Sequence, residues 1–166
     1  SIAGVPIGDS GISVDGDLVA TNLVQDYRSE LWRVTDEGAE LVDLHGLSPF
    51  FIWFSPFERL AAAIDLQHGL FLFDPTTGGD QRKVDGWDAT RGGNPWWSPD
   101  GATVAVESES GRVSIVDTAT GTAKDLEAWD PYQPPALPAL AFGPDGHQLY
   151  GLHVDGTFVR WELATG

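Results

Sequence analysis

One short turn motif recurs four times along this chain of 166 residues, and this repetition restricts the possible folds more than any other feature. Its copies lie at residues 13–16, 55–57, 98–101 and 143–146, at spacings of 42, 43 and 45 residues. A second motif follows each copy after about 18 residues, at 31–33, 72–74, 115–117 and 160–162. Four copies of one structural unit therefore fill the chain.

Each copy predicts four short β-strands. In the third copy, residues 95–97 lead into a Pro-Asp-Gly turn in which Gly101 requires a positive φ. Residues 103–106 and 113–116 follow as strands, and residues 123–126 form a weak outer strand. No stretch has an apolar stripe with the 3.6-residue period of a helix, so we expect an all-β fold.

The length of the repeat and two of its copies resemble known families. Residues 139–146 and 155–166 resemble a WD-repeat blade, and residues 95–101 resemble the repeat of TolB-type propellers. Units of roughly 40–45 residues are typical of propeller blades. The resemblance implies a β-propeller of four-stranded antiparallel blades, with four blades in this chain.

The positions of the repeats along the chain also predict the domain organisation. We expect one propeller domain over residues 1–166, with repeats at 8–44, 45–87, 88–129 and 130–166. Residues 1–7 have no blade of their own, whereas the last blade lacks residues for its outer strand. We therefore expect residues 1–7 to act as a closing outer strand, because this pairing removes an open sheet edge.

The fourth copy departs from the WD pattern in its polar residues. WD-repeat blades bury a hydrogen-bond network formed by a Gly-His pair, a hydroxyl on the second strand, a loop Asp and the Trp of the third strand. Asp155 and Trp161 match this pattern, but Gly151 and Leu152 occupy the hydroxyl region and no Gly-His pair precedes the blade. The network is incomplete, which favours a TolB-like variant.

The charge of the chain excludes several kinds of partner. Nine Lys and Arg against 25 Asp and Glu give a formal net charge of −16, so binding to nucleic acid or to an anionic membrane through bulk charge is not expected. No window approaches 18 consecutive apolar residues, and we expect a soluble domain. Cysteine is absent, which excludes disulfides and thiolate metal sites and leaves the compartment open.

No residue set identifies a chemical reaction. The four histidines lie in unrelated contexts without metal-ligand spacing, so no metal site and no cofactor is expected. Residues 8–11 read Gly-Asp-Ser-Gly like a protease nucleophile, but that family places its His and Asp upstream, and no His precedes Ser10. We therefore expect a non-catalytic protein. A propeller hydrolase or lyase with a site in the central channel is the alternative.

A candidate binding face comes from superposing the repeats. Trp87-Asp88 and Trp129-Asp130 stand 42 residues apart, with Leu44-His45 in the same phase one repeat earlier. By the family's layout, the loops that cross between blades share one face with the loops between second and third strands. Aromatic rings beside carboxylates there would bind a basic protein or peptide. The predicted face comprises Trp87, Asp88, Trp129, Asp130, Tyr132, His68 and Asp155. The alternative is that Trp87 and Trp129 pack as core.

Four blades are few for a propeller of this kind, and an isolated half-ring would expose the apolar faces of its first and last blades. We expect a homodimer that forms an eight-bladed ring, each copy lending its N-terminal strand to the other, and that serves as an interaction module or scaffold. A four-bladed ring closed within one chain is one alternative. The other is that the chain is the C-terminal half of a larger propeller protein.

Overall fold

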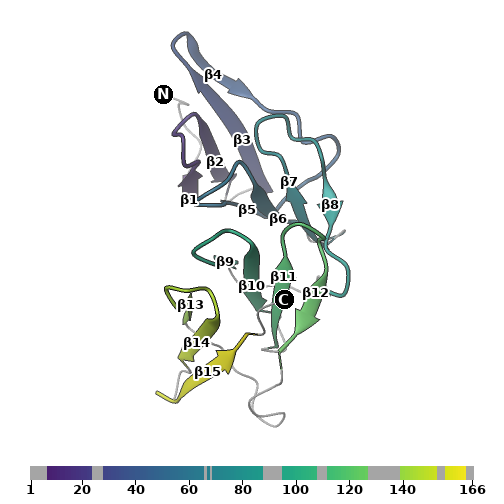
Figure 1. The fold of residues 1–166 in the computed structure, drawn as a ribbon. Helices are drawn as coiled ribbons and strands as arrows, with labels where there is room; N and C mark the ends of the chain where they lie inside the picture. The colour runs from purple at the N-terminus through teal and green to yellow at the C-terminus, as the bar shows by residue number, and fades with distance from the viewer. Residues whose placement is uncertain are drawn as a thin grey trace. The chain divides into compact units, whose positions relative to one another are not determined.

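The structure is a computed structural model that describes residues 7–23, 28–65, 67, 69–87, 95–107, 112–126, 139–152 and 156–163. These residues form four antiparallel sheets and no helix (Figure 1). Three sheets have four strands and one has three, and strands that follow one another along the chain are hydrogen-bonded neighbours. The fold is therefore all-β, and each sheet has the meander order of a propeller blade.

The sheets are called blade 1 to blade 4 in chain order. Blade 1 consists of β1 (Ile7–Ile12), β2 (Leu18–Leu23), β3 (Arg28–Thr35) and β4 (Gly38–Leu41). Blade 2 consists of β5 (Phe51–Phe54), β6 (Ala61–Asp65), β7 (Gly69–Phe73) and β8 (Arg82–Lys83). Blade 3 consists of β9 (Trp96–Trp97), β10 (Thr103–Glu107), β11 (Val113–Asp117) and β12 (Ala123–Asp125). Blade 4 consists of β13 (Ala139–Phe142), β14 (Gln148–Leu152) and β15 (Phe158–Glu162). The strands predicted for the third copy are confirmed as β10, β11 and β12.

The first strand begins one residue earlier than expected. Ile7, which we assigned to the closing strand, lies in β1 because its backbone pairs with Leu23 of β2. Residues 1–6 and 164–166 lie outside the described residues. The closing strand and the repeat boundaries therefore stay predictions.

Strand register repeats from blade to blade at the spacing of the sequence motif. Several positions of each second strand pair with both neighbouring strands, and those that recur at the motif spacing include Val19, Ala61, Val104 and Leu149. Their partners on the third strand are Trp32, Phe73, Val116 and Trp161. In blade 1 the row runs across all four strands as Ile12, Val19, Trp32 and Leu41. Residues in one row share one face of the blade, so equivalent faces can be compared directly.

The turn between the first and second strands has the geometry that its sequence predicts. Gly16, Gly101 and Gly146 have φ values of 75°, 72° and 73°. Their backbone N–H groups donate to the carbonyl three residues earlier at 2.9, 3.0 and 3.0 Å. A positive φ at this position favours glycine, so the expected conformation of Gly101 is confirmed.

Blade 2 closes the same turn without a glycine. Phe57 and Glu58 stand where the other copies have Asp-Gly. The buried Ser55 hydroxyl oxygen accepts hydrogen bonds from the backbone N–H groups of Phe57, at 3.3 Å, and Glu58, at 3.2 Å. A side-chain acceptor thus stabilises the turn in this copy.

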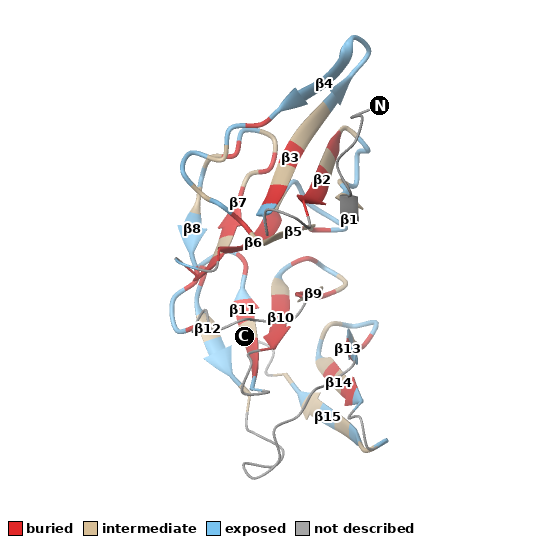
Figure 2. Ribbon diagram, turned by 180° about the vertical axis from the view of Figure 1, so that it is seen from behind, coloured by how far each residue is buried: buried red, intermediate tan, exposed pale blue. Residues whose placement is uncertain are grey.

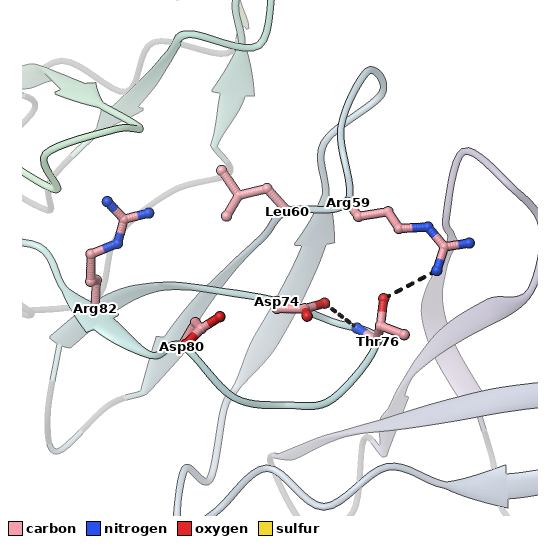
Figure 3. A pocket seen from close by; sticks show the side chains of 6 residues that line it. All are labelled: Arg59, Leu60, Asp74, Thr76, Asp80 and Arg82. Carbon is pink, nitrogen blue, oxygen red and sulfur yellow. Dashed lines mark hydrogen bonds between the residues drawn. The ribbon is translucent and has the colours of Figure 1, made fainter.

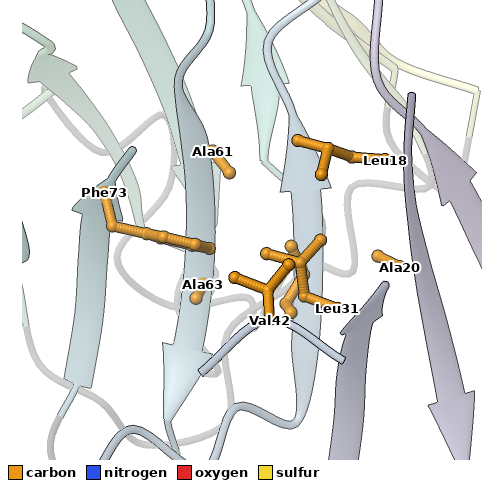
Figure 4. Packing of buried hydrophobic residues seen from close by; sticks show 8 residues of the cluster. Leu18, Ala20, Leu31, Val42, Ala61, Ala63 and Phe73 are labelled. Carbon is orange, nitrogen blue, oxygen red and sulfur yellow. The ribbon is translucent and has the colours of Figure 1, made fainter. Parts of the chain in front are cut away.

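The chain divides into two compact units, Ser1–Lys83 with blades 1 and 2, and Val84–Gly166 with blades 3 and 4. Each unit has its own hydrophobic core. The first core joins both blades of its unit (Figure 4) and contains Leu18, Ala20, Leu31, Val42, Ile52, Ala61, Ala63 and Phe73. The second contains Ala105, Val113, Leu140 and Leu149, packed against Trp96, Ile115, Leu126, Phe142, Trp161 and Leu163. The outer strands β4 and β8 are exposed (Figure 2).

Candidate functional site

The predicted binding face falls almost entirely outside the described residues, which exclude Asp88, Trp129, Asp130, Tyr132, His68 and Asp155. Trp87 is the member that the structure describes. Its side chain is only 7% exposed, and its indole Nε1 is buried with no hydrogen-bond partner. A ring that binds a partner must be accessible, so the expected exposure is wrong for Trp87, and the core interpretation holds for this residue.

The equivalent pair in the preceding repeat is Leu44-His45, and its first residue also packs against a core. Leu44 packs against the core of the first unit, whereas His45 is exposed. His45 has a φ of 48°, and its backbone N–H donates to the Asp43 carboxylate at 2.8 Å. In the two pairs that the structure describes in part, the first residue, Trp87 or Leu44, is thus an apolar anchor of the segment that connects one blade to the next. Such packing is a simpler reason for its recurrence than a ligand.

A buried carboxylate binds the backbone of residues 42–50, the segment that crosses from blade 1 to blade 2. Asp65, at the end of β6, is almost fully buried and accepts hydrogen bonds from the backbone N–H groups of Ser48, at 3.0 Å, and Gln67, at 2.8 Å. Both bonds join loop backbone to the end of the strand, so Asp65 has a structural role. The sequence signal for it is a carboxylate that directly ends an apolar strand.

A polar hollow of about 530 Å³ lies in the first unit (Figure 3) and is lined by Arg59, Leu60, Asp74, Thr76, Asp80 and Arg82. Arg59 donates to Asp15 at 2.8 Å, to Asp17 at 3.3 Å and to the Thr76 hydroxyl at 3.3 Å. Arg33 of blade 1 also donates to the Thr76 carbonyl. These arginines connect blade 1 to the outer turn of blade 2. Sequence reasoning missed them because the contacts join residues up to 44 positions apart.

The carboxylates of the hollow have structural partners. Asp74 accepts hydrogen bonds from the Thr76 backbone N–H at 2.7 Å and from the Thr77 hydroxyl at 3.3 Å, which forms an Asx turn. Asp80 is exposed and has a φ of 50°. Within the described ranges, no group of three or more His, Asp or Glu side chains is placed to hold a metal ion. The hollow is therefore best explained as a joint between two blades.

The carboxyl group of Asp100, in the turn between β9 and β10, accepts two hydrogen bonds. The Ser98 hydroxyl donates to Asp100 at 2.6 Å, and the Ala102 backbone N–H donates to the same oxygen at 3.0 Å. Both bonds favour the ionised form, with the Ser98 bond the larger cause, so the pKa of Asp100 is lowered. The carboxylate stabilises the turn.

Blade 1 presents an apolar face that is partly exposed to solvent. This first-blade face comprises Ile12, Val19, Trp32, Val34 and Leu41. Ile12 is 66% exposed and Leu41 is 59% exposed. In contrast, five of the six equivalent residues in the other blades are fully buried, and the sixth, Trp161, packs against a core; the six are Ala61, Phe73, Val104, Val116, Leu149 and Trp161. Residues of a core type are thus left in contact with solvent, which is typical of an interaction surface.

Blade 4 leaves its opposite face uncovered. This fourth-blade face comprises Tyr150, Leu152, Phe158 and Arg160. Phe158 is 63% exposed and its ring stacks on Tyr150 with centroids 5.5 Å apart. Arg160 forms an ion pair with Glu162 at 3.0 Å. The face therefore combines aromatic surface with a charged pair.

Of the comparisons with known proteins, the one with solved structures supports the fold. No protein-family model matches the sequence, and no curated protein matches it. TolB from Acinetobacter baumannii has a similar structure, with a TM-score of 0.63 and 16% sequence identity over 98% of this chain. This chain spans 42% of the length of that TolB chain. The four sheets are accordingly blades of a TolB-like β-propeller, and 782 chains match this architecture, so it does not select one function.

Proposed function

We propose that the protein is a non-catalytic β-propeller module that assembles with a second copy of itself into an eight-bladed ring. The observation that supports this most is the first-blade face, where Ile12 and Leu41 are exposed although they continue a row of core positions. A propeller buries such a row against the preceding blade. A second copy can supply that blade.

The energy available is sufficient for a stable dimer. A seam between two blades buries roughly 1,000 Å², and an eight-bladed ring of two copies has two new seams. At about 25 cal/mol per Å², the gross gain is tens of kcal/mol before the entropy of association is subtracted.

We propose TolB-type rather than WD-type blades. The indole Nε1 of Trp32, on the third strand of blade 1, is buried without a hydrogen-bond partner. A WD-type blade would use that donor in its polar network. Its unpaired state supports the incomplete network expected from the fourth copy.

A partner of the assembled ring would be a basic protein or peptide on the face of the crossing loops. With Trp87 buried, this proposal is supported by the net charge of −16 and by the recurrence of Asp88 and Asp130. Binding of a lysine-rich peptide, lost on Asp88→Asn with Asp130→Asn and weakened by salt, is the corresponding measurement.

A second candidate has one observation in its favour. Because this chain spans 42% of the TolB chain that it resembles, the blades that cover the first-blade face could belong to the same, longer polypeptide. The face is then an internal blade contact rather than a dimer interface.

The mass in solution tests the proposal. Light scattering of the chain should give twice 17.9 kDa, and Leu41→Glu should give the monomer because a charge cannot be buried in an apolar seam. Val14→Glu is the matched control, since Val14 is also an exposed apolar residue but lies in a turn outside the first-blade face. A wild-type chain that stays monomeric at all concentrations would refute the homodimer.

A further inference from the structure

Each unit has one blade face with exposed apolar residues, the first-blade face in the first unit and the fourth-blade face in the second. In the first unit, Phe73 of blade 2 packs in one cluster with Ala20 and Leu31 of blade 1. In the second unit, Trp161 of blade 4 packs in one cluster with Ala105 and Ile115 of blade 3. Within each unit, the first blade therefore covers the aromatic row of the second.

The same register identifies which residues of blade 4 would cover a following blade. Ala20 pairs with Leu31, and Ala105 pairs with Ile115. The pair at this position in blade 4 is Tyr150 with Arg160. Blade 4 thus has an arginine where blades 1 and 3 have an aliphatic residue, and a tyrosine where they have alanine.

The aromatic residue that lacks its cover is Trp32. It is half-buried and occupies the position of Phe73 and Trp161 in the row. Its Nε1 is buried, so a second copy would contact other atoms of this half-buried residue. An indole ring is the aromatic surface that binds a guanidinium most strongly.

Resting on the homodimer proposed above, we propose that the fourth-blade face of one copy docks on the first-blade face of the other, with Arg160 and Tyr150 against Trp32. Glu162 forms an ion pair with the Arg160 guanidinium from the same strand, at 3.0 Å. The Arg160 side chain is 56% exposed, which leaves it accessible to a second copy. The contact is head to tail, and a ring of two copies joined in this way has two identical seams.

Pairing of the first-blade face with itself is the competing arrangement, and it fits the surface less well. It would leave Phe158 and Leu152 in solvent and would give Arg160 no role. The head-to-tail seam buries both faces. It also places one cation of a strongly acidic chain on an aromatic ring, which discriminates against other apolar partners.

A double-mutant cycle measures the proposed contact. Arg160→Gln and Trp32→Leu should each raise the dissociation constant of the dimer, Arg160→Gln by about three- to thirty-fold, and the double variant should be no weaker than the weaker single variant. Arg112→Gln is the matched control, because Arg112 has a similarly exposed side chain and pairs with Asp125 at 2.9 Å in blade 3. Additive effects of the two substitutions would refute contact between Arg160 and Trp32.

A mixing experiment separates failure of this inference from failure of the homodimer. Leu41→Glu and Phe158→Glu should each give monomers, whereas an equimolar mixture should regain dimers through its one intact seam. Circular dichroism checks that both variants stay folded, and the mutant cycle does not depend on either of them. If Phe158→Glu remains a full dimer while Leu41→Glu is a monomer, the homodimer stands and the head-to-tail seam is wrong. A monomeric wild-type chain refutes both.

Discussion

Blade 1 and blade 2 have the same strand order and the same register, yet equivalent residues have very different environments. Phe73 of blade 2 is fully buried against blade 1, whereas Trp32 is half-buried and Leu41 of its row is 59% exposed. Trp32 and Phe73 are both aromatic and occupy the same position in the strand register, so we attribute the difference to the neighbouring blade. A propeller blade is thus a stable sheet with two faces, and its full stability depends on what covers each face.

The largest expected effect is on the free energy of unfolding, and it contrasts Phe73 with Trp32. Phe73→Ala removes a fully buried ring from the core of the first unit and should lower the free energy of unfolding by about 3–5 kcal/mol. Trp32→Ala should lower it by less than half as much in the monomer, because its ring is partly solvated already. Denaturant unfolding of both variants at low protein concentration checks this. Equal losses would mean that Trp32 is covered within one chain.

The next effect contrasts two glycines with similar backbone angles. Gly16 and Gly78 have φ values of 75° and 71°. A Cβ on Gly16 meets nothing within 4 Å, whereas a Cβ on Gly78 would lie 2.0 Å from the Asp43 carbonyl oxygen. Gly16→Ala should therefore cost about 1 kcal/mol through its dihedral angle alone, and Gly78→Ala about 3 kcal/mol or more. Thermal unfolding of the two variants should separate them, and similar melting temperatures would contradict the close approach of Gly78 to the crossing segment.

A smaller effect concerns the ionic joint between the two blades. Arg59→Gln removes the bonds to Asp15 and Asp17, and the loss of stability should be about 0.5–1 kcal/mol because the Arg59 side chain is 53% exposed. The loss should shrink in 1 M salt, where charge interactions are screened. Unfolding at two salt concentrations tests this, with Arg112→Gln as a control within blade 3. A loss that does not depend on salt would show that Arg59 acts through packing.

The smallest effect concerns the turn between the first two strands, where blade 3 has Asp100 and blade 2 has Phe57. The lowered pKa of Asp100 means that its ionised form stabilises the fold above the ordinary Asp value of 3.8. This contribution is lost as the pH falls from 3.8 through the lowered pKa of the folded state. Asp100→Asn should therefore be less stable than wild type at pH 6, and the difference should vanish in acid. NMR titration of Ser98→Ala, in which the Asp100 pKa should rise, provides the direct check. An unchanged pKa would contradict the role of the Ser98 hydroxyl.

The sequence predicted the parts of this fold that depend on local chemistry. The Gly101 turn and the strands of the third copy follow from residues within one repeat, and the repetition shows which residues matter. The environment of Trp87 could not be predicted in this way, since a recurring Trp is equally compatible with a core anchor and a binding ring. Arg59 gave no periodic signal, because its partners Asp15 and Asp17 lie one repeat away and only the fold brings them together.

The meander order of every sheet also affects how the chain folds. Within the described sheets, each strand pairs with the strand next to it in sequence, so the hydrogen bonds of these ladders form between segments that are close along the chain. Loop closure is then short for every hairpin, which favours rapid formation of individual blades. Contacts such as those of Arg59 and Gly78 can form only afterwards, between blades that already exist. We therefore expect folding intermediates of this protein to be whole blades in which the aromatic rows are not yet covered, the state most exposed to aggregation.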